Sequence, residues 1–376
     1  MVNTSLLGTD WYIDQMKWAC NESKPLPLTI PQSQYLYGTN EYVFITGDDG
    51  SPMYLKDVMD VFKNQDPNYK VMLSSGRKVD FICARKLVVP VNKENCLKYG
   101  IVPEFLADEI PENIVLTISE NKNYITKPEL FMLDLLSNYE WDRPLNLLNM
   151  GGDLNMGIKE YLMYDGFSYR FVPFRNKISA TDPGVVDVDD LYRKMTDGTF
   201  KWDALGRTDY FVDYQNMYTF LGVLSQRQLF VNVANALIDA GENGKALEIL
   251  NKCQGCFPEE NFPLETIPVG FSTNDFMVVQ MVEDYYYLGQ KDRARDLGLR
   301  LSDSLLDTSR FLLEFYDYSS STYENCHRCI VYLADVFKKY GDKKLSDKLL
   351  DSLEVLLRAA TGDLDPESQS GDGESD

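Results

Sequence analysis

The chain has 376 residues, 58 of them acidic and 37 basic, so its net charge at neutral pH is -21. This charge argues against binding to nucleic acid or anionic lipid, because both need clustered Lys and Arg. With 44% hydrophobic and 12% aromatic residues, the chain can build the cores of two domains. It lacks a run of about 18 to 20 apolar residues, the length that crosses a membrane, so we expect this region to be soluble.

The first thirty residues read as the interior of a domain. No charged segment leads into an apolar one, as a signal peptide requires. Asp10 can cap a helix, and apolar residues follow at helical spacing as far as Ala19 and Cys20. Pro25 and the two prolines after it end that helix. We therefore expect the chain to be truncated at its N-terminus.

Short strands and helices alternate as far as Gly206. Branched and aromatic residues predict strands at 42–46, 79–83, 87–91, 113–118, 144–148 and 169–173. Apolar periodicity predicts helices at 55–62 and 158–164. A third helix starts after Thr126, which forms a T-x-x-E capping box with Glu129. Residues 1–206 are thus predicted to form a mixed domain, α+β or α/β, whose strand order one sequence does not fix.

The second half has a helical pattern throughout. Small residues at Ala234 and Ala246 flank Gly241, and Pro258 follows, which is the spacing of a tetratricopeptide helical hairpin. The skeleton recurs twice, at Val282, Tyr285, Gly289 and Ala294 and at Ala334, Phe337, Gly341 and Leu350. The turn glycines lie further apart than the ~34 residues of a contiguous array. We predict an all-α, tetratricopeptide-like domain over 207–362, its hairpins joined by extra connecting segments; the alternative is a generic helical bundle.

The last residues, 363–376, contain six acids, no base and one large apolar residue, Leu364. Such a composition cannot support a core, so we predict a disordered acidic tail.

Seven cysteines, an odd number lying mostly in apolar segments, do not suggest a disulfide framework. Two C-x-x-C pairs, Cys253 with Cys256 and Cys326 with Cys329, could form a four-thiolate zinc site or a redox site. Both pairs fall inside predicted helices, whereas zinc ribbons usually hold such pairs on turns, so packing is the preferred interpretation. The single histidine, His327, removes most catalytic triads and any multi-histidine metal site.

Other motifs are weaker. Asp187 and Asp189 form a D-x-D of the kind that holds a divalent metal in some sugar-nucleotide enzymes, although Asp189 or Asp190 capping a helix at 191–195 explains it more simply. The pair Gly151-Gly152 reads as a turn rather than a phosphate loop. Exposed aromatic residues could bind sugar or peptide, and most are expected in the core. These are the four tryptophans, Trp11, Trp18, Trp141 and Trp202, and the run Tyr285, Tyr286 and Tyr287. We assign no catalytic, cofactor-binding or metal-ligating residue.

Five segments, taken together and in order, resemble the soluble C-terminal region of a membrane protein family. That family is domain of unknown function 2723, grouped with protein O-mannosyltransferase-like proteins of glycosyltransferase family 117 and common in Bacteroidetes. The segments are NTSLLGTDWYIDQM (3–16), NESKPLPLTI (21–30), GRKVDFICARKLVVPV (76–91), KPELFMLDLLSNYEWDRPLN (127–146) and IKEYLMYDGFSYRFVP (158–173).

The resemblance implies an inner-membrane protein whose periplasmic part corresponds to this chain. It also implies that the catalytic acid lies in a loop of a transmembrane domain, and that a strand and an acidic loop precede the segment that opens this chain. All of these are missing here, so no catalytic residue carries over. The expected function is binding of an acceptor polypeptide, glycoprotein or partner protein next to that domain, without a cofactor. The alternative is a free-standing tetratricopeptide-type scaffold unrelated to sugar transfer, and a weaker one is a metal-dependent glycosyltransferase using Asp187 and Asp189.

Overall fold

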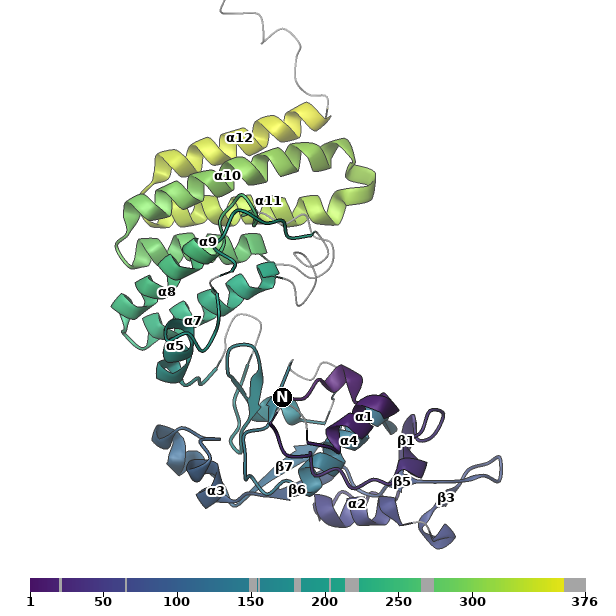
Figure 1. The fold of residues 1–376 in the computed structure, drawn as a ribbon. Helices are drawn as coiled ribbons and strands as arrows, with labels where there is room; N and C mark the ends of the chain where they lie inside the picture. The colour runs from purple at the N-terminus through teal and green to yellow at the C-terminus, as the bar shows by residue number, and fades with distance from the viewer. Residues whose placement is uncertain are drawn as a thin grey trace, which may run out of the picture. The chain divides into compact units, whose positions relative to one another are not determined.

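The computed structural model describes residues 1–19, 22–64, 66–148, 154, 156–178, 184–202, 204–213, 223–264 and 274–361. The chain divides into two compact units, Met1–Asp187 and Val188–Asp376. The first mixes helices and strands and the second is helical (Figure 1), which confirms the predicted fold class. The division precedes the boundary after residue 206 that the sequence suggested, and the predicted tail lies outside the described residues. No helix among the described ranges is long and apolar enough to span a membrane.

The first unit contains short strands around two longer helices, α2 and α4. Its helices are η1 (Thr4–Leu6), α1 (Asp10–Met16), η2 (Gln32–Gln34), α2 (Leu55–Lys63), η3 (Pro67–Tyr69), α3 (Lys93–Lys98), η4 (Glu104–Glu109), α4 (Lys127–Ser137) and η5 (Ile158–Tyr161). Its strands are β1 (Tyr42–Ile45), β2 (Met53–Tyr54), β3 (Val71–Met72), β4 (Lys78–Val79), β5 (Phe81–Ile82), β6 (Lys86–Pro90), β7 (Asn113–Thr117), β8 (Tyr124–Thr126), β9 (Asn146–Leu147), β10 (Leu162–Tyr164) and β11 (Tyr169–Phe171).

These strands form three three-stranded sheets, ordered β5-β1-β8, β2-β6-β7 and β10-β11-β9, and the pair β3-β4. The pairs β1–β5 and β2–β6 are parallel, and the other ladders are antiparallel. Parallel pairing needs a crossover, and α2, lying between β2 and β6 in the chain, supplies it. The carboxyl ends of β2 and β6 therefore lie beside the start of α2.

Three local predictions for this unit are wrong. Residues 158–164 form the short 3-10 helix η5 and then strand β10 instead of one helix, because Leu162, Met163 and Tyr164 pair with β11 and are all buried. The strand predicted at 79–83 is split between β4 and β5, which belong to different sheets. The N-cap position of helix α1 is Thr9, whose side chain makes no capping hydrogen bond, and Asp10 is already the first helical residue. The helix ends at Met16, so Ala19 lies beyond it and is exposed.

Helix α4 is buried along most of its length and carries one carboxylate into the core. Asp134 is fully buried and accepts hydrogen bonds from the backbone N–H groups of Thr29 (2.5 Å) and Ile30 (3.0 Å) and from the Thr29 hydroxyl (2.7 Å). After the helix, Arg143 donates to the carbonyls of Lys24 (2.7 Å) and Pro25 (2.6 Å). The proline-rich segment is thus held against α4 by these two side chains.

The start of α4 is as predicted. Thr126 and Glu129 form a complete capping box, in which the Thr126 N–H donates to Glu129 Oε2 at 2.8 Å. The other Glu129 oxygen pairs with Lys122 at 2.7 Å. Because Glu129 is fully buried, both its oxygens need such partners.

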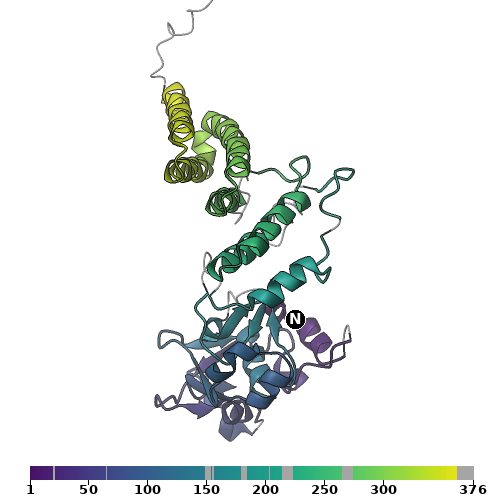
Figure 2. The same ribbon diagram turned by 90° about the vertical axis from the view of Figure 1, so that its left-hand side faces the viewer.

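The second unit is built helix after helix, from α5 to α12 (Figures 1 and 2). Its elements are α5 (Val188–Thr196), η6 (Val223–Gln226), α7 (Arg227–Asp239), α8 (Asn243–Cys256), α9 (Asn274–Tyr287), α10 (Lys291–Glu314), α11 (Tyr316–Lys339) and α12 (Lys343–Thr361). Helices α7, α9 and α11 each begin a hairpin and pack in succession, α7 on α9 and α9 on α11. This is the stacking of a helical repeat array.

The three predicted turn glycines close the three hairpins. Gly241, Gly289 and Gly341 have φ of +78°, +74° and +84°, which glycine adopts without strain. In each turn the N–H after the glycine donates at 2.8 Å to a carbonyl of the preceding helix's last turn, completing a Schellman motif. The first two hairpins are joined by an extra segment between Cys256 and Asn274, as predicted. The second and third are not, because α10 and α11 extend to 24 residues each and meet at Phe315 without an extra loop.

Aligned on these glycines, the buried positions of the three hairpins coincide. Before the glycine the matching sets are Phe230, Val278 and Ile330, then Val233, Met281 and Leu333, then Leu237, Tyr285 and Phe337; after it the set is Ala246, Ala294 and Ser346. All are at most 3% exposed. Leu350, predicted as a core position of the third hairpin, is instead 40% exposed, and Leu349 and Leu353 are buried in its place.

Helix α5 belongs with the hairpins because it packs on α7 and α8. Tyr192 donates from its hydroxyl to Glu248 at 2.6 Å, and Lys252 donates to the carbonyl of Met195 at 2.6 Å. These contacts join α5 to α8 and explain why the second unit begins at Val188.

One carboxylate is buried between the first two hairpins. Asp284 of α9 is 3% exposed, and its partners are amides: Gln280 Nε2 at 2.9 Å and, with its amide nitrogen facing the carboxylate, Asn235 of α7 at 3.0 Å. Burial, with the nearby charges of Glu283 and Asp239, raises the pKa of Asp284 to about 7. The folded chain thus holds a proton here at mildly acidic pH.

Replacing Asp134 by Ala should destabilise the first unit by about 3 kcal/mol, because the N–H groups of Thr29 and Ile30 lose a buried acceptor. Urea unfolding and hydrogen exchange at these two amides measure the effect. The control Asp60→Ala, at an exposed partner of Lys63 (3.3 Å), should change stability by less than about 0.5 kcal/mol. Unchanged protection of the two amides in Asp134→Ala would contradict the assignment.

Gly289→Ala should destabilise the second unit by about 1 kcal/mol. A Cβ there meets no atom within 4 Å, so the whole cost is the positive φ. Gly244→Ala, equally uncrowded but inside α8 without a positive φ, should stabilise it by a few tenths of a kcal/mol up to about 1 kcal/mol. Thermal unfolding of the two variants gives the comparison, and shifts of the same sign would show that the positive φ is not the cause.

Asp284→Asn should remove a pH dependence of stability. Between about pH 4 and pH 7 the folded state keeps the Asp284 proton that the unfolded state has released, so the free energy of unfolding falls as pH rises. The variant should lose this slope and be more stable than the parent above pH 7, by an amount on the order of 2 to 4 kcal/mol. Urea titrations of the parent and the variant at pH 5 and pH 8 test this. If the free energy of unfolding falls between these two pH values by as much in the variant as in the parent, the prediction is refuted.

Candidate functional site

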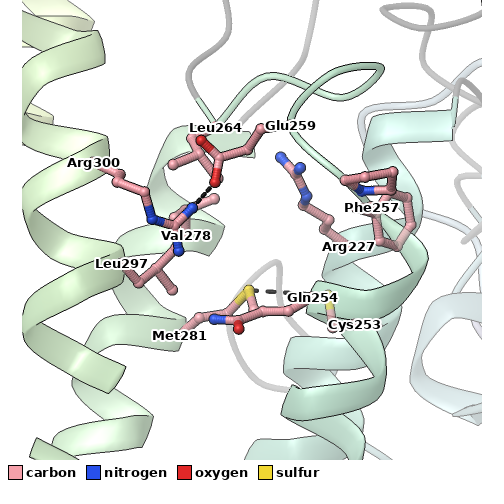
Figure 3. Close-up of a pocket in the computed structure, with 11 residues that line it drawn as sticks. Arg227, Cys253, Gln254, Phe257, Glu259, Leu264, Val278, Met281, Leu297 and Arg300 are labelled. Carbon is pink, nitrogen blue, oxygen red and sulfur yellow. Dashed lines mark hydrogen bonds and ion pairs between the residues drawn. The ribbon is translucent and has the colours of Figure 1, made fainter. Parts of the chain in front are cut away.

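A pocket of about 150 Å³ lies between the first two hairpins (Figure 3). Its apolar wall comes from α9 and α10, through Val278, Met281 and Leu297, and from Leu264 in the segment after α8. Typical small-molecule pockets measure about 300 to 1,000 Å³. The pocket is therefore sized for one apolar side chain rather than for a cofactor.

Arg227 builds the wall on the side of α7. Its guanidinium donates to the carbonyls of Phe262 and Pro263, both at 2.7 Å, and lies 5.3 Å from the ring of Phe257. Only 2% of Arg227 is exposed. It therefore holds the segment after α8 in place, and its charge is directed to backbone carbonyls rather than to the pocket mouth.

An ion pair lies at the mouth of the pocket. Arg300 of α10 pairs with Glu259, and its other nitrogen lies 2.9 Å from Asp296. Both Arg300 and Glu259 keep about two fifths of their side chains exposed. A pair that is half in water contributes little to stability, so a charged ligand can exchange with either partner at small cost.

The C-x-x-C cysteines are packed side chains. Cys253 lines the pocket with its Sγ 4.0 Å from Met281 Sδ, and burial raises the pKa of its thiol to about 12. Such a group stays protonated and is neither a nucleophile nor a metal-ready thiolate at neutral pH. Cys256, Cys326 and Cys329 are likewise buried within α8 and α11. Over the part of the chain that the structure describes, no three His, Cys, Asp or Glu side chains gather to hold a metal ion.

The other sequence motifs are scattered. Asp189 lies in the first turn of α5, 87% exposed, and pairs with Lys245 at 3.0 Å, while Asp187 precedes the helix. Asp189 and Asp190 thus lie within the helix instead of capping it, where acidic groups favour the helix dipole. His327 of α11 lies 6.2 Å from the ring of Tyr323. Gly151, Gly152 and the C-terminal tail lie outside the described residues.

The aromatic residues that the sequence singled out divide into a buried and an exposed group. Trp141, Trp202, Tyr285 and Tyr286 are buried, whereas Trp11, Trp18 and Tyr287 are more than half exposed. The exposed tryptophans belong to the first unit and Tyr287 to the second.

Sequence reasoning missed two features of the second unit. The pocket depends on residues from four elements that no motif connects, and only the hairpin register brings Cys253 next to Met281. The buried carboxylate of Asp284 was also missed, although its place in an apolar helix, next to the tyrosine run, was the available signal.

Comparison with known families adds an independent finding. The model of the family described as TMEM260-associated domain 2 matches residues 1–190, while neither a curated protein nor a solved structure matches the chain. The matched residues include all five segments on which the family resemblance rests and end just inside α5. The match supports a domain related to a membrane glycosyltransferase-like family. Since it covers half of the 376 residues, the chain belongs to the TMEM260-associated domain 2 family.

Proposed function

We propose that this chain is the periplasm-facing module of an inner-membrane glycosyltransferase-like protein related to domain of unknown function 2723. Its helical hairpins bind the acceptor polypeptide or glycoprotein, or a partner protein, while bond-making belongs to the protein's own transmembrane domain. No nucleic acid is involved, in keeping with the net charge of -21.

The observation that carries the proposal is the shared register of the three hairpins. Stacked hairpins of this kind present extended surfaces that bind polypeptides. The pocket between the first two hairpins adds a place for one apolar side chain, and the Glu259–Arg300 pair adds charges of both signs at its mouth. An extended peptide with an apolar residue next to a charged one matches these features.

Binding without catalysis is sufficient to accelerate sugar transfer. A tethered binding module raises the effective concentration of the acceptor near the membrane active site into the mM range when its linker is short. The module then contributes to acceptor choice and rate without a catalytic residue of its own.

A free-standing scaffold is the alternative, and one observation favours it. The family match ends at residue 190, so the hairpins lie outside the matched part of the chain. Gene sequence upstream of Met1 separates the two proposals: membrane-spanning segments in the same reading frame favour the module, and their absence favours the scaffold.

Deleting residues 227–361 from the full-length gene product should abolish most protein glycosylation, measured as glycopeptides by mass spectrometry of extracytoplasmic proteins. Glu259→Arg should lower the yield several-fold, because it places two cations side by side at the pocket mouth. Glu354→Arg is the matched control, since Glu354 is an exposed partner of Arg358 in α12, away from the pocket. Full glycosylation after the deletion would rule out the proposal.

A further inference from the structure

A larger cavity, of about 410 Å³, lies in the first unit beside the carboxyl ends of β2 and β6. Three segments line it: the start of α2, residues 89–92 at the end of β6, and residues 136–141 at the end of α4. Its volume falls in the range of ligand pockets. In α/β sheets, this edge of parallel strands is where ligands bind.

The wall formed by residues 139–141 is rigid and strained. Trp141 has φ of +55°, a region that bulky side chains rarely adopt. Its indole N–H donates to the carbonyl of Pro90 at 2.9 Å, and its ring stacks on Phe171 at 5.5 Å and 18°. Tyr139 covers it at 4.9 Å. These contacts hold the strained backbone of Trp141 in place. Strained residues that are held in this way occur more often at functional sites than elsewhere.

Polar groups of both kinds surround these rings. Asp57 and Glu140 carry exposed carboxylates, whose oxygens are able to accept hydrogen bonds from a ligand. Asn92, whose oxygen accepts from the N–H of Asn95 at 3.0 Å, can donate through its Nδ2. The first turn of α2 adds N–H donors, because Tyr54 at its N-cap makes no side-chain cap. The exposed ammonium of Lys56 is a further donor, and Tyr54, which is 53% exposed, supplies the aromatic surface because Trp141 and Tyr139 are buried. The cavity therefore offers acceptors, donors and aromatic surface together.

This combination selects one class of ligand. An anion would face the two carboxylates of Asp57 and Glu140 against the one ammonium of Lys56, and an apolar ligand would desolvate all three charges at a cost. An amine would pair with the carboxylates but leave the N–H donors unmatched. Sugar hydroxyls both donate and accept, and the apolar face of a sugar ring packs on aromatic side chains. We infer that this cavity binds a neutral saccharide unit through Asp57, Asn92 and Glu140, with the half-exposed ring of Tyr54 as its aromatic face, beside the wall that the buried Trp141 holds in place.

The site belongs to the first unit, and it goes beyond the proposed polypeptide binding by the hairpins. Either can fail without the other, because saccharide binding is measured on the chain alone and the hairpin deletion is measured on glycosylation in cells. The saccharide can come from a glycan already attached to a protein or from a free sugar, and both share the same hydroxyl and ring-face chemistry.

The test is a titration of the ¹⁵N-labelled full chain, followed through the indole N–H signal of Trp141. The probes are glucose, mannose, galactose and N-acetylglucosamine, each as the free sugar and as its methyl glycoside. n-Butylamine and inorganic phosphate serve as the cation and anion probes. At least one sugar should shift the Trp141 signal saturably with a Kd in the mM range, and the amine and phosphate should not.

Asp57→Asn and Glu140→Gln should each weaken sugar binding at least tenfold without unfolding the chain, because both side chains are exposed. Asp60→Asn is the matched control: it lies in the same helix, pairs with Lys63 and does not line the cavity, so its Kd should equal that of the parent. Absence of binding by every sugar in the panel would overturn the inference. Equal binding in Asp57→Asn and Glu140→Gln, or saturable binding of n-butylamine instead of sugar, would also overturn it.

Discussion

The buried carboxylate of Asp134 is the contact on which the first unit depends. It joins the middle of α4 to the backbone of Thr29 and Ile30, and Arg143 joins the end of that region to Lys24 and Pro25. Both partners of each contact fall in the segments 21–30 and 127–146, on which the family resemblance rests. These residues therefore specify how the proline-rich segment docks. The groups that we propose to bind ligands lie elsewhere, at the edge of β2 and β6 and between the hairpins.

In the second unit, too, the residues that hold the fold differ from those that line the pocket. Glycine turns with positive φ fix each hairpin, and matched buried positions fix how the hairpins stack. Helix α5 covers one end of the array through Tyr192 and Lys252. Within that framework the segment after α8 is held by Arg227, which shapes a pocket that no single helix contains. Asp284 shows the cost of such packing, since burial moves the pKa of its carboxyl to about 7.

Local signals predicted much of this structure. The Thr126 capping box and the turns at Gly241, Gly289 and Gly341 form where the sequence places them. So do the strands rich in branched residues, except the one predicted at 79–83. Predictions failed where pairing or stacking outweighed local pattern: β10 pairs with β11 although its residues also suit a helix, and Leu350 turns outward because Leu349 and Leu353 face the core. The sites were hardly predictable, because Trp141 and Tyr54, or Cys253 and Met281, meet only through the fold. The family match therefore narrows the range of functions to consider more than any single sequence motif does.

Photocrosslinking from the hairpin pocket tests the central claim most directly. A photoreactive amino acid at position 254, where Gln254 lines the pocket, is introduced into the full-length gene product and irradiated in cells that glycosylate their proteins. We expect covalent adducts with proteins that also carry the transferred sugar, and far fewer adducts from exposed position 354 on α12. Adducts that contain no glycosylated protein, or equal yields from the two positions, would contradict the binding of acceptor polypeptide by these hairpins.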